Sequence, residues 1–110
     1  MNASLFSAQV IGYVGHVRTK NLQGGTVYAI SVCVSVPPDQ ADAEPANEWV
    51  EGILRGSLAN AVGKYLQPGR LVYMDGAFEN KRFVKKDGSQ GTIGRLKVAN
   101  FRFLDSFQQQ

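Results

Sequence analysis

The sequence contains one cysteine, Cys33, and one histidine, His16. A single cysteine excludes an intrachain disulfide and a cysteine-rich zinc site, and a single histidine excludes metal sites built from several imidazoles. No apolar run approaches the roughly 20 residues that a membrane-spanning helix needs. Residues 1–7 lack the basic and apolar regions of a secretory signal. These absences favour a reducing, cytoplasmic setting with no membrane contact.

Catalytic patterns are also missing. The sequence has no G-x-x-x-x-G-K-[ST] phosphate loop. Asp75 and Glu79 are four residues apart in an expected strand, so they share a face and form a carboxylate pair of the kind used in acid–base chemistry. Because lysines and arginines surround them in the sequence, this pair is better suited to salt bridges. We therefore expect a binding protein with no enzymatic activity, no cofactor and no metal.

Charge is distributed unevenly along the 110 residues. The 12 Lys and Arg and 9 Asp and Glu give a net charge of +3. Five of the acids lie between Asp39 and Glu51, a segment without lysine or arginine, so that segment carries −5 and the rest of the chain +8. This asymmetry predicts a basic surface formed largely by the C-terminal half and an acidic loop held away from it. An ordinary solvated surface explains the same charges, so a polyanion partner needs other support.

Alternating apolar residues and turn signals predict five strands and one helix. The second strand is the clearest, with bulky residues such as Ile30 and Val32 on one face and small ones such as Ser31 and Cys33 on the other. The small face leaves room for something to lie across it. The first expected strand is long, starts at Phe6 and has bend or bulge points at Gly12 and Gly15. Strands over 26–36 and 48–55 follow, and then a helix of about ten residues that is capped by Ser57 and stopped at Pro68-Gly69. The last two expected strands, over 71–83 and 92–104, are joined by a hairpin turn at Asp87-Gly88.

The order of these elements is three strands, a helix and two strands. It is the order of an all-β OB-fold, a five-stranded barrel with one short helix between strands 3 and 4. A five-stranded SH3-like barrel and a generic α+β domain are the alternatives. We expect residues 1–105 to form one OB-fold domain and residues 106–110 to be a short disordered stub.

Two aromatic residues stand out from the expected core. Trp49 shares a strand face with Glu51 and Arg55, and Phe83 lies inside the basic run Lys81–Lys86. Aromatic faces on which bases stack, together with cations that neutralise phosphates, are what binding of single-stranded nucleic acid requires. The alternatives are that Trp49 packs against a partner subunit and Phe83 against the sheet.

The whole chain resembles the bacterial single-stranded DNA-binding protein (SSB) family. The similar stretches are VIGYVGHV, GGTVYAISVCVSV, EW followed by LRGSLANAVGKYLQPGRLVYMDGAF, and NKRF. The resemblance covers about residues 6 to 104. It implies non-specific binding of single-stranded DNA in replication, recombination or repair, in the bacterial cytoplasm near the nucleoid. It also implies a homo-oligomer, with a tetramer favoured and a dimer, as in the related primosomal replication protein B group, as the alternative.

The resemblance also implies a set of site residues. Trp49 matches a stacking tryptophan, Phe83 takes the place of a tryptophan in the arm, and Lys81 and Arg18 match basic phosphate-contacting positions. Arg55 stands where the family has a stacking phenylalanine, and Arg can both stack on a base and pair with a phosphate. With the charge pattern, the expected DNA contacts are Trp49, Phe83, Arg18, Lys20, Arg55, Lys81, Arg82, Lys85, Lys86, Arg95 and Lys97.

Several departures from the family pattern weaken the expected binding. The loop PPDQADAEPAN has no aromatic, and Glu51 replaces a residue that is often basic. The sequence ends without the family's acidic tip, so tail-dependent recruitment of other enzymes is not expected, and a plasmid, phage or integrated-element origin fits a short relative. The alternative function is an OB-fold adaptor of a primosome or replisome that acts mainly through protein–protein contacts.

Overall fold

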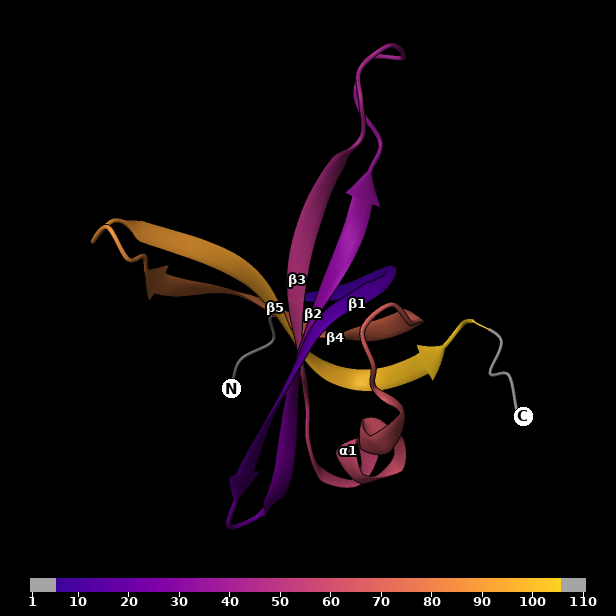
Figure 1. The fold of residues 1–110 in the computed structure, drawn as a ribbon, viewed down its shortest axis with the longest axis vertical. Helices are drawn as coiled ribbons and strands as arrows, with labels where there is room; N and C mark the ends of the chain where they lie inside the picture. Colours follow the sequence, from indigo (N-terminus) through magenta and orange to yellow (C-terminus); the bar gives the residue numbers. More distant parts are fainter. Residues whose placement is uncertain (1–5, 106–110) are drawn as a thin grey trace.

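Five strands and one short helix make up the computed structural model, which describes residues 6–105 (Figure 1). The elements in chain order are β1 (Ser7–Leu22), β2 (Gly25–Val36), β3 (Ala46–Leu54), α1 (Gly56–Val62), a 3-10 turn η1 (Gly63–Tyr65), β4 (Leu71–Val84) and β5 (Gln90–Phe103). All five predicted strands and the predicted helix are therefore present. The predicted stub at 106–110 lies outside the described residues.

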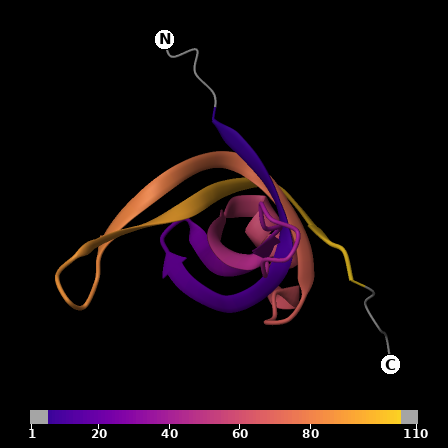
Figure 2. The same cartoon turned by 90° about the horizontal axis from the view of Figure 1, so that it is seen from above.

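The strands form a closed barrel in the order β1-β2-β3-β5-β4. Neighbouring strands are antiparallel except β3 and β5, which pair in parallel and close the barrel. Seen from above, the strands curve round a ring and the β4–β5 hairpin extends beyond it as an arm (Figure 2). A five-stranded barrel with its helix between β3 and β4 confirms the predicted OB-fold.

The core lies inside this ring and follows the predicted alternation. Ile30 and Val32 of β2, Leu54 of β3, Met74 of β4 and Leu96 of β5 are completely buried. Ala59 of α1 joins the same core, so the helix packs against the barrel through its apolar side. Because the inward positions are filled by branched and sulfur-containing side chains, the outward positions are left to carry function.

The helix starts differently from the prediction. With η1 it spans the predicted ten residues, but Arg55 rather than Ser57 occupies the N-cap position, in extended conformation and without a side-chain capping hydrogen bond. Gly56 has a positive φ of 69°, a conformation that glycine adopts without steric cost. The chain therefore turns into the helix at Gly56, and Ser57 falls within the first helical turn.

One of the two predicted irregularities of β1 is confirmed. The β1–β2 register shifts between Val14 and His16, which places a bulge at Gly15. Gly12 pairs regularly with β4, so no bulge forms there. Its residue type is explained by crowding, because a Cβ on Gly12 would stand 2.8 Å from Cγ1 of Val32.

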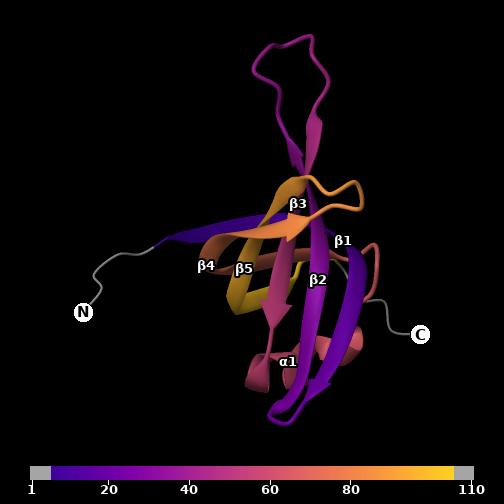
Figure 3. The same ribbon diagram turned by 90° about the vertical axis from the view of Figure 1, so that its left-hand side faces the viewer.

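Three hairpins project from the barrel, and they make the strands longer than predicted (Figures 1 and 3). The β2–β3 ladder continues to the pair Val36–Ala46 and carries the acidic loop over residues 37–45. The β4–β5 ladder continues to the pair Val84–Gln90 beside the predicted Asp87-Gly88 turn. Among residues 6–105, no helix is long and apolar enough to cross a membrane.

Candidate nucleic-acid interface

A groove of about 550 Å³ crosses the outer face of the barrel. Its floor includes Ala29 of β2 and Ile53 of β3, which are in register with each other, with Arg18 of β1 and with Lys97 of β5. The small and apolar floor thus lies between cations from the two flanking strands. This arrangement matches the prediction that the small face of the second strand leaves room for a ligand.

Six basic residues that the sequence singled out line this groove. They come from three strands, β1, β4 and β5, and from the start of the helix, and they are Arg18, Lys20, Arg55, Lys81, Arg95 and Lys97. Residues more than 70 positions apart in sequence are brought together here because β3 pairs with β5 and β1 pairs with β2. The barrel closure, rather than any local run of charge, produces this cluster.

Glu51 lies within the same groove and is buried, with 8% of its surface exposed. Its carboxylate is 3.6 Å from Nη2 of Arg18, 3.7 Å from Nη1 of Arg95 and 4.0 Å from Nζ of Lys81. The sequence pattern placed Glu51 on the outward face together with Trp49, and the register confirms the face. Burial of this carboxylate was not predicted, because it depends on long side chains that arrive from β1, β4 and β5.

Trp49 is half exposed, at 48%, on the same outward face of β3 as Glu51. Its register partner on β2 is Cys33, and its ring reaches across β2 to Gly15 of β1. The six-membered part of the indole ring would collide with a Cβ at Gly15. Trp49 lies two residues from the groove residue Glu51, towards the β2–β3 projection, and presents an apolar surface with one part supported by Gly15 and one part open.

Phe83 lines a second hollow, on the β4–β5 arm. It is 41% exposed, and it packs over Gly91, its register partner on β5. Arg82, Lys85 and Phe83 line this hollow, while Lys86 lies exposed in the turn that follows. The arm thus presents an aromatic ring among cations on an element that projects from the barrel, which suits contact with an extended ligand.

The predicted basic residues differ in how many ion pairs and hydrogen bonds they form with acidic side chains of the protein, and in how exposed they are. Arg95 has only 27% of its side chain exposed and donates a hydrogen bond from Nε to Oε1 of Glu79 at 3.1 Å, in addition to its ion pair with Glu51. The side chain of Arg18 is 78% exposed. Salt bridging of Glu79 agrees with the prediction for the Asp75–Glu79 pair. Asp75 instead accepts hydrogen bonds from Tyr73 and Asn100, which hold its pKa below the ordinary value.

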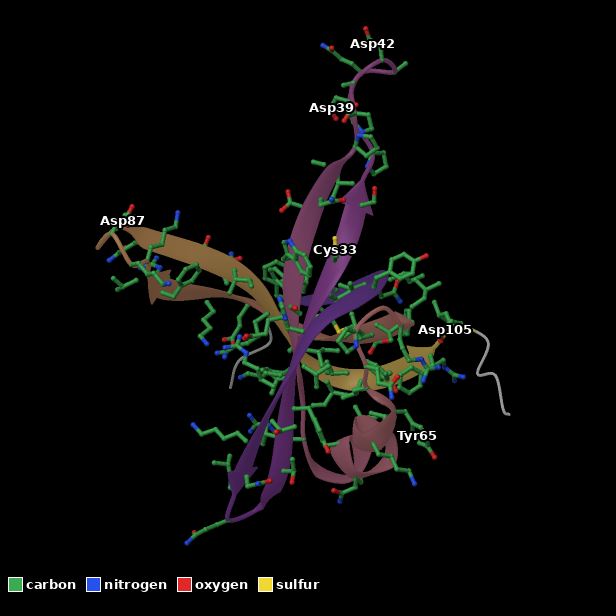
Figure 4. The ribbon with its side chains drawn as sticks, in the orientation of Figure 1. Cys33, Asp39, Asp42, Tyr65, Asp87 and Asp105 are labelled. Atoms are coloured by element: carbon green, nitrogen blue, oxygen red, sulfur yellow. The ribbon has the colours of Figure 1, made fainter. Side chains whose placement is uncertain are left out.

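The acidic loop lies apart from the groove. Asp39 and Asp42 lie on the projection formed by β2 and β3, whereas Asp87 lies at the tip of the β4–β5 arm (Figure 4). The separation agrees with the prediction of an acidic loop held away from the basic surface. Among the residues that line the groove, all of them in the described part of the chain, Glu51 is therefore the one acidic side chain.

At the C-terminal end of β5, Asp105 is engaged with Arg70. Nη2 of Arg70 donates to Oδ1 of Asp105 at 2.8 Å, and the guanidinium lies 4.0 Å from the centre of the Phe103 ring. The Arg70 hydrogen bonds lower the pKa of Asp105 below its ordinary value. This carboxylate therefore fastens the last strand to the start of β4.

Comparison with known proteins gives a relative in sequence and several in structure. No model of a known protein family matches the chain. The chain is 30% identical over 111 residues to single-stranded DNA-binding protein 1 of Xylella fastidiosa (strain 9a5c), an alignment that covers 96% of this chain and 82% of that protein.

Solved structures share the barrel at lower identity. The small single-stranded DNA-binding protein of Streptomyces coelicolor has a TM-score of 0.79 and 14% identity, over 90% of this chain and 94% of that one. The Plasmodium falciparum SSB in complex with ssDNA has a TM-score of 0.74 and 23% identity, over 96% of this chain and 100% of that one. These likenesses show the fold, and the sequence match over nearly the whole chain shows that the protein belongs to the single-stranded DNA-binding protein family.

Proposed function

We propose that this protein binds single-stranded DNA without sequence specificity, by stacking bases on Trp49 and Phe83 and by contacting phosphates with the basic residues of the groove and the arm. The observation that carries the proposal is the placement of an open indole, a cation-lined groove and an aromatic arm along connected strands. Every type of base has a face that can stack, and every nucleotide has a phosphate. These contacts therefore do not distinguish one base sequence from another. No catalytic step is part of the proposal.

The relatives support the same partner. The Plasmodium falciparum protein was solved with ssDNA, and the Xylella fastidiosa protein is a single-stranded DNA-binding protein by name. We infer a role in replication, recombination or repair in the cytoplasm of a bacterial cell, close to the nucleoid, where transiently unpaired strands need protection. Residues 1–105 act as one domain in this role.

Fluorescence anisotropy with labelled oligonucleotides tests the proposal. We expect oligo-dT and mixed-sequence strands to bind with similar affinity and duplex DNA to bind much more weakly. The logarithm of the binding constant should fall linearly with the logarithm of salt concentration, with a slope of about −0.7 for each phosphate contacted. A flat salt response, or equal binding of duplex, would contradict phosphate and base contacts in the groove.

We further propose that the chain acts as a homo-oligomer, with a tetramer favoured over a dimer. The supporting observation is on the outer face of β1, where Ile11 and Tyr13 are 56% and 57% exposed. Tyr73 of β4 lies beside Ile11 in register, which extends the apolar surface. A single barrel contacts only about 4–16 nucleotides, so several copies are needed to wrap a longer strand.

A second candidate function is a protein–protein adaptor within a primosome or replisome. The observation that favours it is the acidic loop on the β2–β3 projection, which carries no aromatic residue for stacking (Figure 4). An adaptor would retain the fold and lose useful affinity for DNA. The anisotropy experiment separates the two, because an adaptor would show no saturable binding of oligo-dT.

A further inference from the structure

The carboxylate of Glu51 lies among cations that the proposed function assigns to phosphates. Of the residues that line the groove, all within the described part of the chain, Glu51 alone is acidic. Arg18, Lys81 and Arg95 come to within 4.0 Å of it from three different strands. One negative charge thus lies at the centre of three of the cations that the bound strand would use.

The contacts to this carboxylate are long and lack hydrogen-bond geometry. The three N–O distances run from 3.6 to 4.0 Å, and Oε1 is buried without a hydrogen-bond partner. By contrast, Arg70 and Asp105 form a hydrogen-bonded pair at 2.8 Å. Charge attraction alone therefore holds the three cations near Glu51, and such pairs exchange partners more easily than pairs with fixed hydrogen bonds.

We propose that Glu51 is an internal counter-ion from which the DNA phosphates take over Arg18 and Lys81, so that this one residue limits affinity and sets the salt dependence of binding. The inference rests on the proposed DNA-binding function. Carboxylate and phosphate compete for the same cations, and a negative charge at the groove floor also repels an incoming phosphate. Removal of the carboxylate charge should therefore strengthen binding, which is the opposite of the usual effect of a substitution in a binding site.

The three cations paired with Glu51 should not respond equally to a bound strand. Arg18 and Lys81 have 78% and 43% of their side chains exposed, so they can swing towards a phosphate. Arg95 is more buried and has a second carboxylate partner in Glu79. Arg95 therefore remains in place during binding, and the gain on removal of the Glu51 charge comes through Arg18 and Lys81.

Glu51→Gln tests the proposal, and Glu48→Gln is its matched control. Both substitutions add one unit to the net charge on β3, but Glu48 lies exposed on the projecting end of the strand and does not line the groove. In anisotropy titrations with oligo-dT at low salt, we expect E51Q to bind about tenfold more tightly than E48Q, as release of a few partly exposed ion pairs allows. The salt slope of E51Q should be steeper by about 0.7 for each additional phosphate contacted.

Each outcome bears on the proposal. If wild type binds oligo-dT and E51Q binds no more tightly than E48Q, Glu51 is not a competitor and the inference fails while the proposed function stands. If neither wild type nor E51Q binds, the proposed function fails and the inference falls with it. Should thermal denaturation show that E51Q is unfolded, Glu51→Asp takes its place, because the shorter side chain withdraws the carboxylate from Arg18 and Lys81 at unchanged net charge. Tighter binding by E51D then supports the proposal, and unchanged or weaker binding overturns it.

Discussion

The indole ring of Trp49 lies against the backbone of Gly15. A Cβ built on Gly15 would stand 2.6 Å from Cζ3 and 2.8 Å from Cη2 of the ring, closer than carbon atoms pack. Gly15 is also the bulged residue of β1. The bulge and the lack of a side chain thus occur at the residue against which the Trp49 ring packs. The orientation of the proposed stacking surface is thus set by a glycine two strands away.

Gly15→Ala should displace the indole and weaken binding of oligo-dT by up to about 1–3 kcal/mol, the range of one lost base stack. The tryptophan emission of the free protein should also change, because the ring loses its support. Gly24→Ala is the control, since a Cβ there meets nothing within 4 Å. If G15A retains both the emission spectrum and the affinity of G24A, the ring does not depend on Gly15.

Trp49→Ala and Phe83→Ala should each weaken DNA binding by about 1–3 kcal/mol and leave the fold intact, because both side chains are partly exposed and neither belongs to the buried core. Val84→Ala, the neighbour of Phe83 on the arm and 71% exposed, serves as the control. Affinity comes from anisotropy and folding from circular dichroism. If W49A dissociates the oligomer at unchanged affinity per subunit, Trp49 belongs to a subunit interface instead.

Ile11→Glu should dissociate the oligomer, because it places a charge on the apolar outer face of β1. Light scattering at micromolar concentration measures the molar mass of the variant and of wild type. Val84→Glu, which alters an exposed apolar residue on the arm, should leave the mass unchanged. A monomeric wild type, or an I11E variant of the same mass as wild type, would refute the proposed interface.

Asp105→Asn should reduce the free energy of unfolding at neutral pH. The Arg70 hydrogen bonds lower the pKa of Asp105 in the folded state, so folding favours its ionised form. This stabilisation is complete above the ordinary pKa of about 4 and is lost as the pH falls through the lower folded value. Denaturant unfolding should therefore separate wild type from D105N at pH 7 and less so near pH 3. Asp42→Asn, in the exposed loop, is the control, and an equal effect of the two variants at pH 7 would contradict the role of the Arg70 pair.

The fold was predictable from the sequence because its strands alternate clearly. Ile30 and Val32 against Ser31 and Cys33 identify a strand and its inner face without any tertiary information. The helix start was mispredicted, since Ser57 has the residue type of a cap while the conformational freedom of Gly56 decides where the chain turns. Local propensity was correct about the element and wrong about its first residue.

The sequence predicts which residues line the candidate site, but not which of them contact one another. The exposure of Trp49 and Phe83 follows from their polar neighbours in sequence. The burial of Glu51 does not, because its cations come from β1, β4 and β5 and meet it only after the barrel closes. The support of Trp49 by Gly15 depends in the same way on register across β2.

Intrinsic fluorescence tests the central claim most directly, because Trp49 is the only tryptophan in the sequence. We expect stepwise addition of oligo-dT to quench its emission to a plateau, as bases stack on the indole, and added salt to reverse the quenching as phosphate contacts are lost. An emission spectrum that stays unchanged at saturating oligo-dT, from a protein shown to be folded by circular dichroism, would contradict stacking on Trp49 and favour the adaptor.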